Sequence, residues 1–174
     1  MANLLFHPAF KRKSDAIIKD LLGHGLSTVI ASGYRSPEEQ ARLYAVGRYQ
    51  PNSNVVISGL KIKVPSKSQY PNWKIVTKAK PFKSAHQWGI ACDFAWIVNG
   101  KLQYEAGSSW WKLLYSSAKA HECEDITKSI PWDRGHIQWK IAWSTIKDHM
   151  NEFMQLYQKF SIKECWKRLD KYLA

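Results

Sequence analysis

An apolar run from Ile90 to Val98 is interrupted by one carboxylate, Asp93, and this run limits the possible folds more than any other part of the chain. A short apolar run of this kind predicts a buried strand. An ionised aspartate in a buried strand is costly unless it is paired or binds a metal ion. His86 lies seven residues earlier, and a turn at Gly89 would fold its imidazole back toward the carboxylate. The run therefore predicts a polar site on a strand.

A second polar cluster lies in the aromatic stretch 131–139, where Asp133 and His136 stand three residues apart. Catalytic zinc sites use three nitrogen or oxygen ligands from the protein and keep a fourth position open. Two histidines and Asp93 meet that need, and a further carboxylate outside the ligand set can take a proton from water. On this pattern alone, a hydrogen-bonded structural pair of His and Asp remains the alternative.

The remaining chain predicts an α+β fold, with a small antiparallel sheet, flanking helices and the zinc site on the sheet. Apolar spacing and turn residues predict helices at about 14–22, 36–47, 108–121, 143–157 and 161–172, and strands at 26–32 and 101–104. Ser36 and Ser161 each stand three residues before a glutamate, as in a capping box. Asn99-Gly100 predicts a type I′ turn.

The segment 48–83 is strongly basic, with eight lysines and arginines and no acidic residue. It contains four prolines and two short β-prone runs, 55–57 and 61–64, which predict a long loop with a hairpin. A block of one charge indicates an anionic partner, and nucleic acid, an anionic wall polymer and lipopolysaccharide all qualify. A solvated loop that keeps the protein soluble is the alternative.

Cysteine usage and apolar content bear on the cell compartment. Cys92, Cys123 and Cys165 form no CxxC pair and predict reduced, partly buried thiols. No segment approaches the roughly 20 apolar residues of a membrane span, and residues 1–13 lack the apolar core of about 7–15 residues that a signal peptide needs. We expect synthesis in a bacterial host cytoplasm, without a signal peptide, and action on the cell wall after release. His7, with the histidines at 24 and 149, is interpreted as a surface residue.

Three motifs in order carry a family resemblance. Ser84-x-His86-x6-Asp93, the later Asp133-x-x-His136 and the upstream stretch 32–40 (SGYRSPEEQ) resemble the zinc peptidases of the D-Ala-D-Ala carboxypeptidase and L-alanyl-D-glutamate endopeptidase group. This group includes phage endolysins and vancomycin-resistance enzymes, and its fold is of the hedgehog/D-Ala-D-Ala-peptidase type. The resemblance covers roughly residues 25–140.

The resemblance implies a role for each matching residue. His86, Asp93 and His136 would bind one zinc ion per chain. Asp133 stands at the position of the catalytic acid/base, which is Glu in many members. Arg35 would bind substrate, polarise the scissile carbonyl and stabilise its developing negative charge.

Two further side chains have weaker assignments. Ser84 would hydrogen-bond substrate or a ligand side chain, and local capping is the alternative. Gln138 would orient His136, and an ordinary strand residue is the alternative. The long basic insert departs from the family pattern and leaves the cleaved bond open.

The expected organisation is a zinc peptidase domain over 1–142, with the insert 48–83, and C-terminal helices over 143–174 that pack on the same domain. Alternatively, the last helix binds anionic outer-membrane lipid or lipopolysaccharide through a cationic amphipathic surface. Its apolar face would consist of Ile162, Cys165, Trp166, Leu169 and Leu173.

The leading functional prediction is a monomeric phage endolysin of the L-alanyl-D-glutamate endopeptidase type, acting on peptidoglycan. The first alternative is a D,D-carboxypeptidase or dipeptidase of wall maturation or resistance. The second is a non-catalytic module that binds wall or nucleic acid, with Tyr70 and Trp73 of the basic insert stacking on bases. We do not expect nucleic acid as the partner, because a binding module requires neither metal ligands nor a spare carboxylate.

Overall fold

The computed structural model describes residues 4–104 and 107–174. The chain divides into two compact units. Unit 1 consists of residues 1–34 and 88–174, and unit 2 of residues 35–87. The basic insert 48–83 lies entirely within unit 2, and the C-terminal residues 143–174 belong to unit 1.

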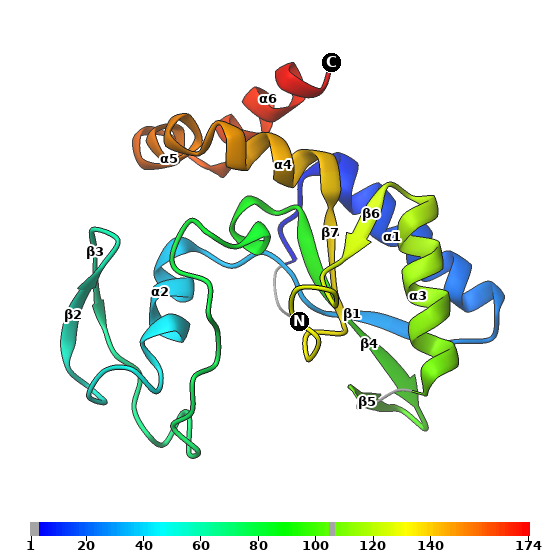
Figure 1. Ribbon diagram of the computed structural model, residues 1–174, viewed down its shortest axis with the longest axis horizontal. Coiled ribbons are helices and arrows are strands. Elements are labelled where there is room, and N and C mark those ends of the chain that lie inside the picture. Colours follow the sequence, from blue (N-terminus) through cyan, green and yellow to red (C-terminus); the bar gives the residue numbers. More distant parts are fainter. Residues whose placement is uncertain (1–3, 105–106) are drawn as a thin grey trace. The chain divides into compact units, whose positions relative to one another are not determined.

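Unit 1 is built on an antiparallel sheet, five-stranded in the described residues, with the order β1-β4-β7-β6 and β5 paired to β4 (Figure 1). The strands are β1 (Thr28–Ser32), β4 (Ala91–Val98), β5 (Lys101–Gln103), β6 (Cys123–Asp125) and β7 (His136–Trp139). The predicted α+β class with a small antiparallel sheet is thus confirmed. Asn99 and Gly100 between β4 and β5 both have positive φ, 50° and 73°, as the predicted type I′ turn requires.

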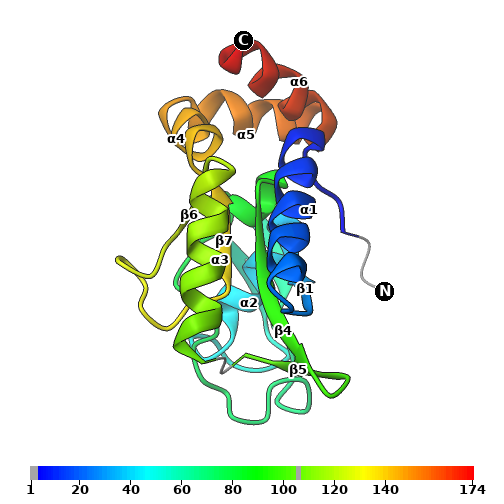
Figure 2. The same ribbon diagram turned by 90° about the vertical axis from the view of Figure 1, so that its right-hand side faces the viewer.

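Two helices, α1 (Pro8–Gly23) and α3 (Ser108–Ala120), cover one face of this sheet (Figure 2). Their buried side chains include Phe10, Ile17 and Leu21 from α1 and Trp110 and Leu114 from α3. Helix α1 begins earlier than the predicted residue 14. Pro8 occupies its first turn, and the His7 ring accepts a hydrogen bond from the backbone N–H of Ala9. Because histidine is an uncommon capping residue, the usual capping pattern does not reveal this start.

His7 is buried, with 1% of its surface exposed, so its interpretation as a surface residue was wrong. Its Nε2 lies 3.1 Å from Asp170 Oδ1, and its ring lies 5.4 Å from the Trp139 ring and 5.7 Å from the Trp166 ring. Asp170 and Trp166 belong to the last helix, α6 (Ile162–Leu173). The burial depends on two ends of the chain meeting, which local sequence does not indicate.

The C-terminal part of unit 1 contains α4 (Lys140–Asp148), α5 (Met150–Lys159) and α6. The prediction of one helix over 143–157 was wrong, because the chain leaves helical geometry at His149 (φ −114°, ψ 26°). Ile146, Met150 and Phe153 remain buried across this break, so the apolar spacing continues through it. The predicted Ser161 capping bond is also absent from the described structure.

The apolar face of α6 is buried within unit 1. Cys165 and Leu169 are at most 1% exposed, and Trp166 Nε1 donates a hydrogen bond of 2.7 Å to the carbonyl oxygen of Trp88. This packing favours the interpretation of α6 as part of the core over that of a membrane-binding element. In residues 4–104 and 107–174, no helix has both the length and the apolar character that a bilayer span requires.

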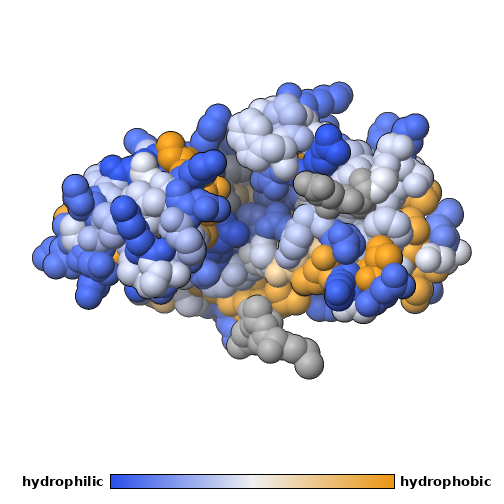
Figure 3. Space-filling view, turned by 90° about the horizontal axis from the view of Figure 1, so that it is seen from below, coloured by the Kyte–Doolittle hydropathy of each residue, from blue (hydrophilic) through white to orange (hydrophobic). Residues whose placement is uncertain are grey.

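Unit 2 contains α2 (Pro37–Ala45) and the hairpin of β2 (Asn54–Ile57) and β3 (Leu60–Lys63). Ser36 caps α2 as predicted, since its Oγ accepts a hydrogen bond of 3.1 Å from the Glu39 N–H. The predicted hairpin is confirmed. A small core joins the helix to the hairpin, and it consists of Ala41, Ala45, Ile57, Ile62 and Val64. The face of unit 2 that Figure 3 shows is largely hydrophilic.

Candidate metal centre

Strand pairing brings Asp93 and His136 together. Asp93 on β4 lies directly opposite His136 on β7 and opposite Ser32 on β1. Because side chains of directly paired residues share one face of a sheet, all three meet there. His136 Nδ1 lies 3.5 Å from Asp93 Oδ1, and Ser32 Oγ donates a hydrogen bond to the other oxygen, Oδ2. The carboxylate is therefore held with one oxygen toward the imidazole.

Gly135 allows the loop before β7 to lie against β4. Its carbonyl oxygen accepts a hydrogen bond of 2.9 Å from the Phe94 N–H. A Cβ at this position would lie 2.6 Å from the Phe94 carbonyl oxygen, which is too close for any side chain without a backbone shift. The absence of a side chain at Gly135 thus sets how closely His136 approaches Asp93.

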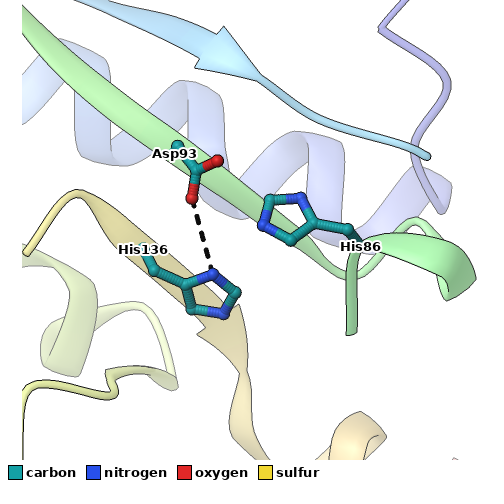
Figure 4. A group of neighbouring side chains, drawn as sticks. All are labelled: His86, Asp93 and His136. Atoms are coloured by element: carbon teal, nitrogen blue, oxygen red, sulfur yellow. Dashed lines mark ion pairs between the residues drawn. The ribbon is translucent and has the colours of Figure 1, made fainter. Parts of the chain in front are cut away.

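His86 stands in the short 3-10 helix η1 (Ala85–Trp88), which precedes β4. Gly89 makes the predicted turn with a φ of +67°, and a Cβ there would lie 2.8 Å from the Trp166 ring. One ligand atom from each of His86, Asp93 and His136 lies within 4.8 Å of the others, and the three side chains point toward one another (Figure 4). The three predicted ligands are therefore brought together.

The chemistry of this donor set fits zinc. Ligands about 2.1 Å from a tetrahedral zinc ion lie about 3.4 Å from one another. The 3.5 Å between His136 Nδ1 and Asp93 Oδ1 is close to that spacing. Both histidines are buried, with 3% and 5% of their surfaces exposed, and the Asp93 side chain is 26% exposed. Two imidazoles and one carboxylate leave a coordination position for water or substrate.

The electrostatic environment of His136 is strongly anionic. Burial alone would lower its pKa, but the hydrogen bond and charge of Asp93, with the charge of Asp133, outweigh burial and raise the pKa above its ordinary value. The same negative charges favour a bound cation. A divalent metal ion would therefore replace a proton as the positive charge of this site.

Asp133 and Asp93 line one cavity of about 590 Å³ in unit 1. The backbone N–H of Asp133 donates a hydrogen bond of 3.1 Å to the Ile130 carbonyl, which closes the turn before β7. The cavity walls carry aromatic side chains and a guanidinium, and the other lining residues are Phe94, Tyr104, Trp111, Trp132, Arg134 and Gly135. Asp133, the predicted acid/base, and Asp93, a predicted metal ligand, thus border the same space.

Arg35 and Ser84, the predicted substrate contacts, both lie in unit 2. The Arg35 guanidinium donates a hydrogen bond of 3.1 Å to Gln40 Oε1, and its backbone N–H donates one of 3.3 Å to the His86 carbonyl. Ser84 begins the turn of η1, where its carbonyl oxygen accepts from the Gln87 N–H at 3.1 Å. Their roles toward substrate remain predictions.

Two polar residues near the centre escaped the sequence interpretation. Ser32 donates a hydrogen bond to Asp93, although the sequence shows Ser32 only as the first residue of the upstream stretch 32–40. Glu124 accepts a hydrogen bond of 2.9 Å from Gln138 Nε2, and the predicted contact of Gln138 with His136 is present at 3.1 Å. No local signal identifies Glu124, because the three-residue strand β6 is too short to show a period.

Similarity to known proteins extends over most of the chain. The model of the VanY family, described as D-alanyl-D-alanine carboxypeptidase, matches residues 3–126. This range includes His86 and Asp93 and ends before Asp133 and His136. The peptidoglycan L-alanyl-D-glutamate endopeptidase CwlK of Bacillus subtilis (strain 168) is 27% identical over 148 residues, which are 82% of this chain and 70% of CwlK.

Three similar solved structures are each 16% identical to this chain, and two of them are described as vancomycin-resistance enzymes. A mutant of the D,D-pentapeptidase VanY from a VanB-type cassette, in complex with Zn(II), aligns over 95% of this chain and 86% of its own, with a TM-score of 0.48. The D,D-dipeptidase VanXYg, in complex with a D-Ala-D-Ala phosphinate analog, aligns over 95% and 59%, with a TM-score of 0.49. VanYB in complex with D-alanine-D-alanine aligns over 94% and 84%, with a TM-score of 0.47.

Proposed function

Since this chain belongs to the VanY family of D-alanyl-D-alanine carboxypeptidases, we propose that it is a zinc-dependent peptidase that hydrolyses the stem peptides of bacterial peptidoglycan. The observation that carries this proposal is the convergence of His86, Asp93 and His136 within 4.8 Å. The similarity to the peptidoglycan endopeptidase CwlK over 82% of the chain supports the substrate. The protein would act at the cell wall, as a monomer with one zinc ion.

The roles of the chain's own residues follow from their chemistry. Bound zinc would supply Lewis-acid activation of water and of the scissile carbonyl. Asp133, which borders the same cavity as Asp93, would take the proton from the attacking water and return it to the leaving amine. The Arg35 guanidinium would stabilise negative charge on the substrate carbonyl oxygen, and Ser84 would contact the substrate.

We propose the bond between L-alanine and D-glutamate as the cleaved bond, and a phage endolysin as the biological role. The relation to CwlK supports this bond. The description of the matched family favours a second candidate, a D,D-carboxypeptidase or dipeptidase that acts on terminal D-alanine. The strongly basic composition, with a net charge of +12, supports either role, because it would draw the protein to an anionic wall.

Digestion of purified peptidoglycan, with mass analysis of the new termini, tests these roles. Cleavage by an L-alanyl-D-glutamate endopeptidase exposes new D-glutamate amino termini and releases no free D-alanine. Release of D-alanine or of the D-Ala-D-Ala dipeptide would instead support the second candidate. Wall that is bound but chemically unchanged, in the presence of zinc, would contradict both and leave a binding module.

We further propose that the basic segment 48–83 of unit 2 adds contacts to anionic lipid or lipopolysaccharide. Its eight positive charges with no acidic residue support this role. Binding to vesicles with 30% anionic lipid should exceed binding to neutral vesicles and should fall as salt rises. A variant with Lys61, Lys63 and Lys67 changed to Gln should lose much of this binding. Equal binding to both kinds of vesicle would contradict the proposal.

A further inference from the structure

A row of hydrogen bonds leads from the candidate metal centre across two strands. Glu124 on β6 lies directly opposite Gln138 on β7, and His136 is two residues from Gln138 on the same strand. Gln138 Nε2 donates to Glu124 Oε1 at 2.9 Å, and Gln138 Oε1 lies 3.1 Å from His136 Nε2. His136 and Gln138 are both buried, with 5% and 6% of their surfaces exposed. The side chains of His136, Gln138 and Glu124 therefore form a continuous chain of hydrogen bonds on one face of the sheet, which we call the relay.

The direction of each hydrogen bond in the relay follows from the ionised carboxylate at its outer end. A carboxylate at neutral pH can accept hydrogen bonds but cannot donate them. The Gln138 amide must therefore turn its NH₂ group toward Glu124, which leaves its carbonyl oxygen facing His136. A carbonyl oxygen also only accepts, so the proton in this second bond must belong to His136 Nε2.

This assignment decides which ring nitrogen is available to a metal ion. With the proton on Nε2, the lone pair of a neutral His136 lies on Nδ1. Nδ1 is the nitrogen that lies 3.5 Å from the carboxylate of Asp93, another predicted ligand. Without the carboxylate, the buried amide could turn over and present its NH₂ group, which would favour a lone pair on Nε2 instead.

We propose that Glu124, acting through Gln138, is a positioning residue that fixes the Nε2-protonated form of His136 and so presents Nδ1 to the metal ion. The inference rests on the proposed zinc site. Partners of this kind typically contribute 10–100-fold to metal affinity. Glu124→Ala should therefore raise the zinc dissociation constant by about 10–100-fold.

Zinc dissociation constants, measured by competition with a chromophoric chelator, test the proposal. Glu124→Gln keeps an acceptor oxygen for Gln138 and should bind zinc more tightly than Glu124→Ala. The matched control is Glu164→Ala, which removes an exposed carboxylate of α6 that pairs with Lys167 and should leave zinc affinity unchanged. Wild-type affinity in Glu124→Ala would overturn the proposal, and so would equal losses in Glu124→Ala and Glu164→Ala.

Nitrogen-15 NMR of the His136 ring gives a second readout that needs no variant. In the zinc-loaded protein, and in the zinc-free protein above the pKa of the imidazole, the proton should reside on Nε2. A proton on Nδ1 would overturn the relay even if Glu124→Ala failed to fold. A wild-type protein that binds no zinc but keeps the Nε2 proton would contradict the proposed function and leave the relay intact.

Discussion

Gly135 offers a sharp test of how the fold builds the centre. In Gly135→Ala the new Cβ would lie 2.6 Å from the Phe94 carbonyl oxygen, about 0.8 Å short of the 3.4 Å at which ordinary contact begins. The Cβ is fixed rigidly to the backbone and its partner is a backbone oxygen, so either the loop before β7 or strand β4 must move. Overpacking of this kind costs about 1–3 kcal/mol of unfolding free energy.

The same movement should weaken metal binding, because functional geometries tolerate displacements of only about 0.5 Å. Urea denaturation followed by tryptophan fluorescence gives the free energy of unfolding, and chelator competition gives the zinc affinity. Gly23→Ala is the matched control, since a Cβ there meets nothing within 4 Å at the end of α1. The control should be neutral or stabilising by up to about 1 kcal/mol. Wild-type stability and zinc affinity in Gly135→Ala would refute the reasoning.

Two further predictions concern the reacting carboxylate and the thiols. Asp133→Asn should lower wall hydrolysis by about 10²–10⁴-fold while zinc content stays unchanged, and undiminished hydrolysis would exclude Asp133 as the acid/base. Burial raises the pKa of the Cys123 and Cys165 thiols to about 12, so little of the reactive thiolate exists at pH 8. A disulfide reagent should label the folded protein far more slowly than the urea-unfolded protein, and rapid labelling of the folded protein would contradict this burial.

The sequence predicted the part of the centre that depends on local pattern. An apolar run broken by Asp93 predicts a buried strand with a polar site, and the structure forms this strand as β4. His86 returns toward it through a turn at Gly89. The pairing of Asp93 with His136 belongs to the tertiary structure, since the register of β4 with β7 depends on contacts between distant segments. The family motifs predicted that Asp93 and His136 meet, whereas apolar periodicity does not predict the register between distant strands.

The features that sequence patterns failed to predict were missed for one physical reason. The strand β6 is three residues long, and it therefore carries Glu124 without any detectable period. The break at His149 keeps the same side of the helix inward, so the spacing of apolar residues does not reveal it. His7 is buried because Trp139 of β7 and Trp166 of α6, both distant in sequence, pack against its ring. In each case, long-range packing decides what local propensity leaves open.

Unit 2 is longer than the segment that its basic composition identifies. The basic charge marks residues 48–83, whereas unit 2 spans residues 35–87. Helix α2 belongs to this unit because Ala41 and Ala45 pack with Ile57 and Ile62 of the hairpin. A composition change marks the loop, but the helix that shares its core has an ordinary composition.

Zinc content by elemental analysis tests the central claim most directly. After loading with zinc and removal of the excess, the wild-type protein should hold one zinc ion per chain, and His86→Ala should hold much less. His24→Ala is the matched control, because His24 is exposed and its ring contacts the Asp20 backbone. It should keep the full zinc content. A zinc-free wild-type protein, or full zinc content in a folded His86→Ala variant, would contradict the account.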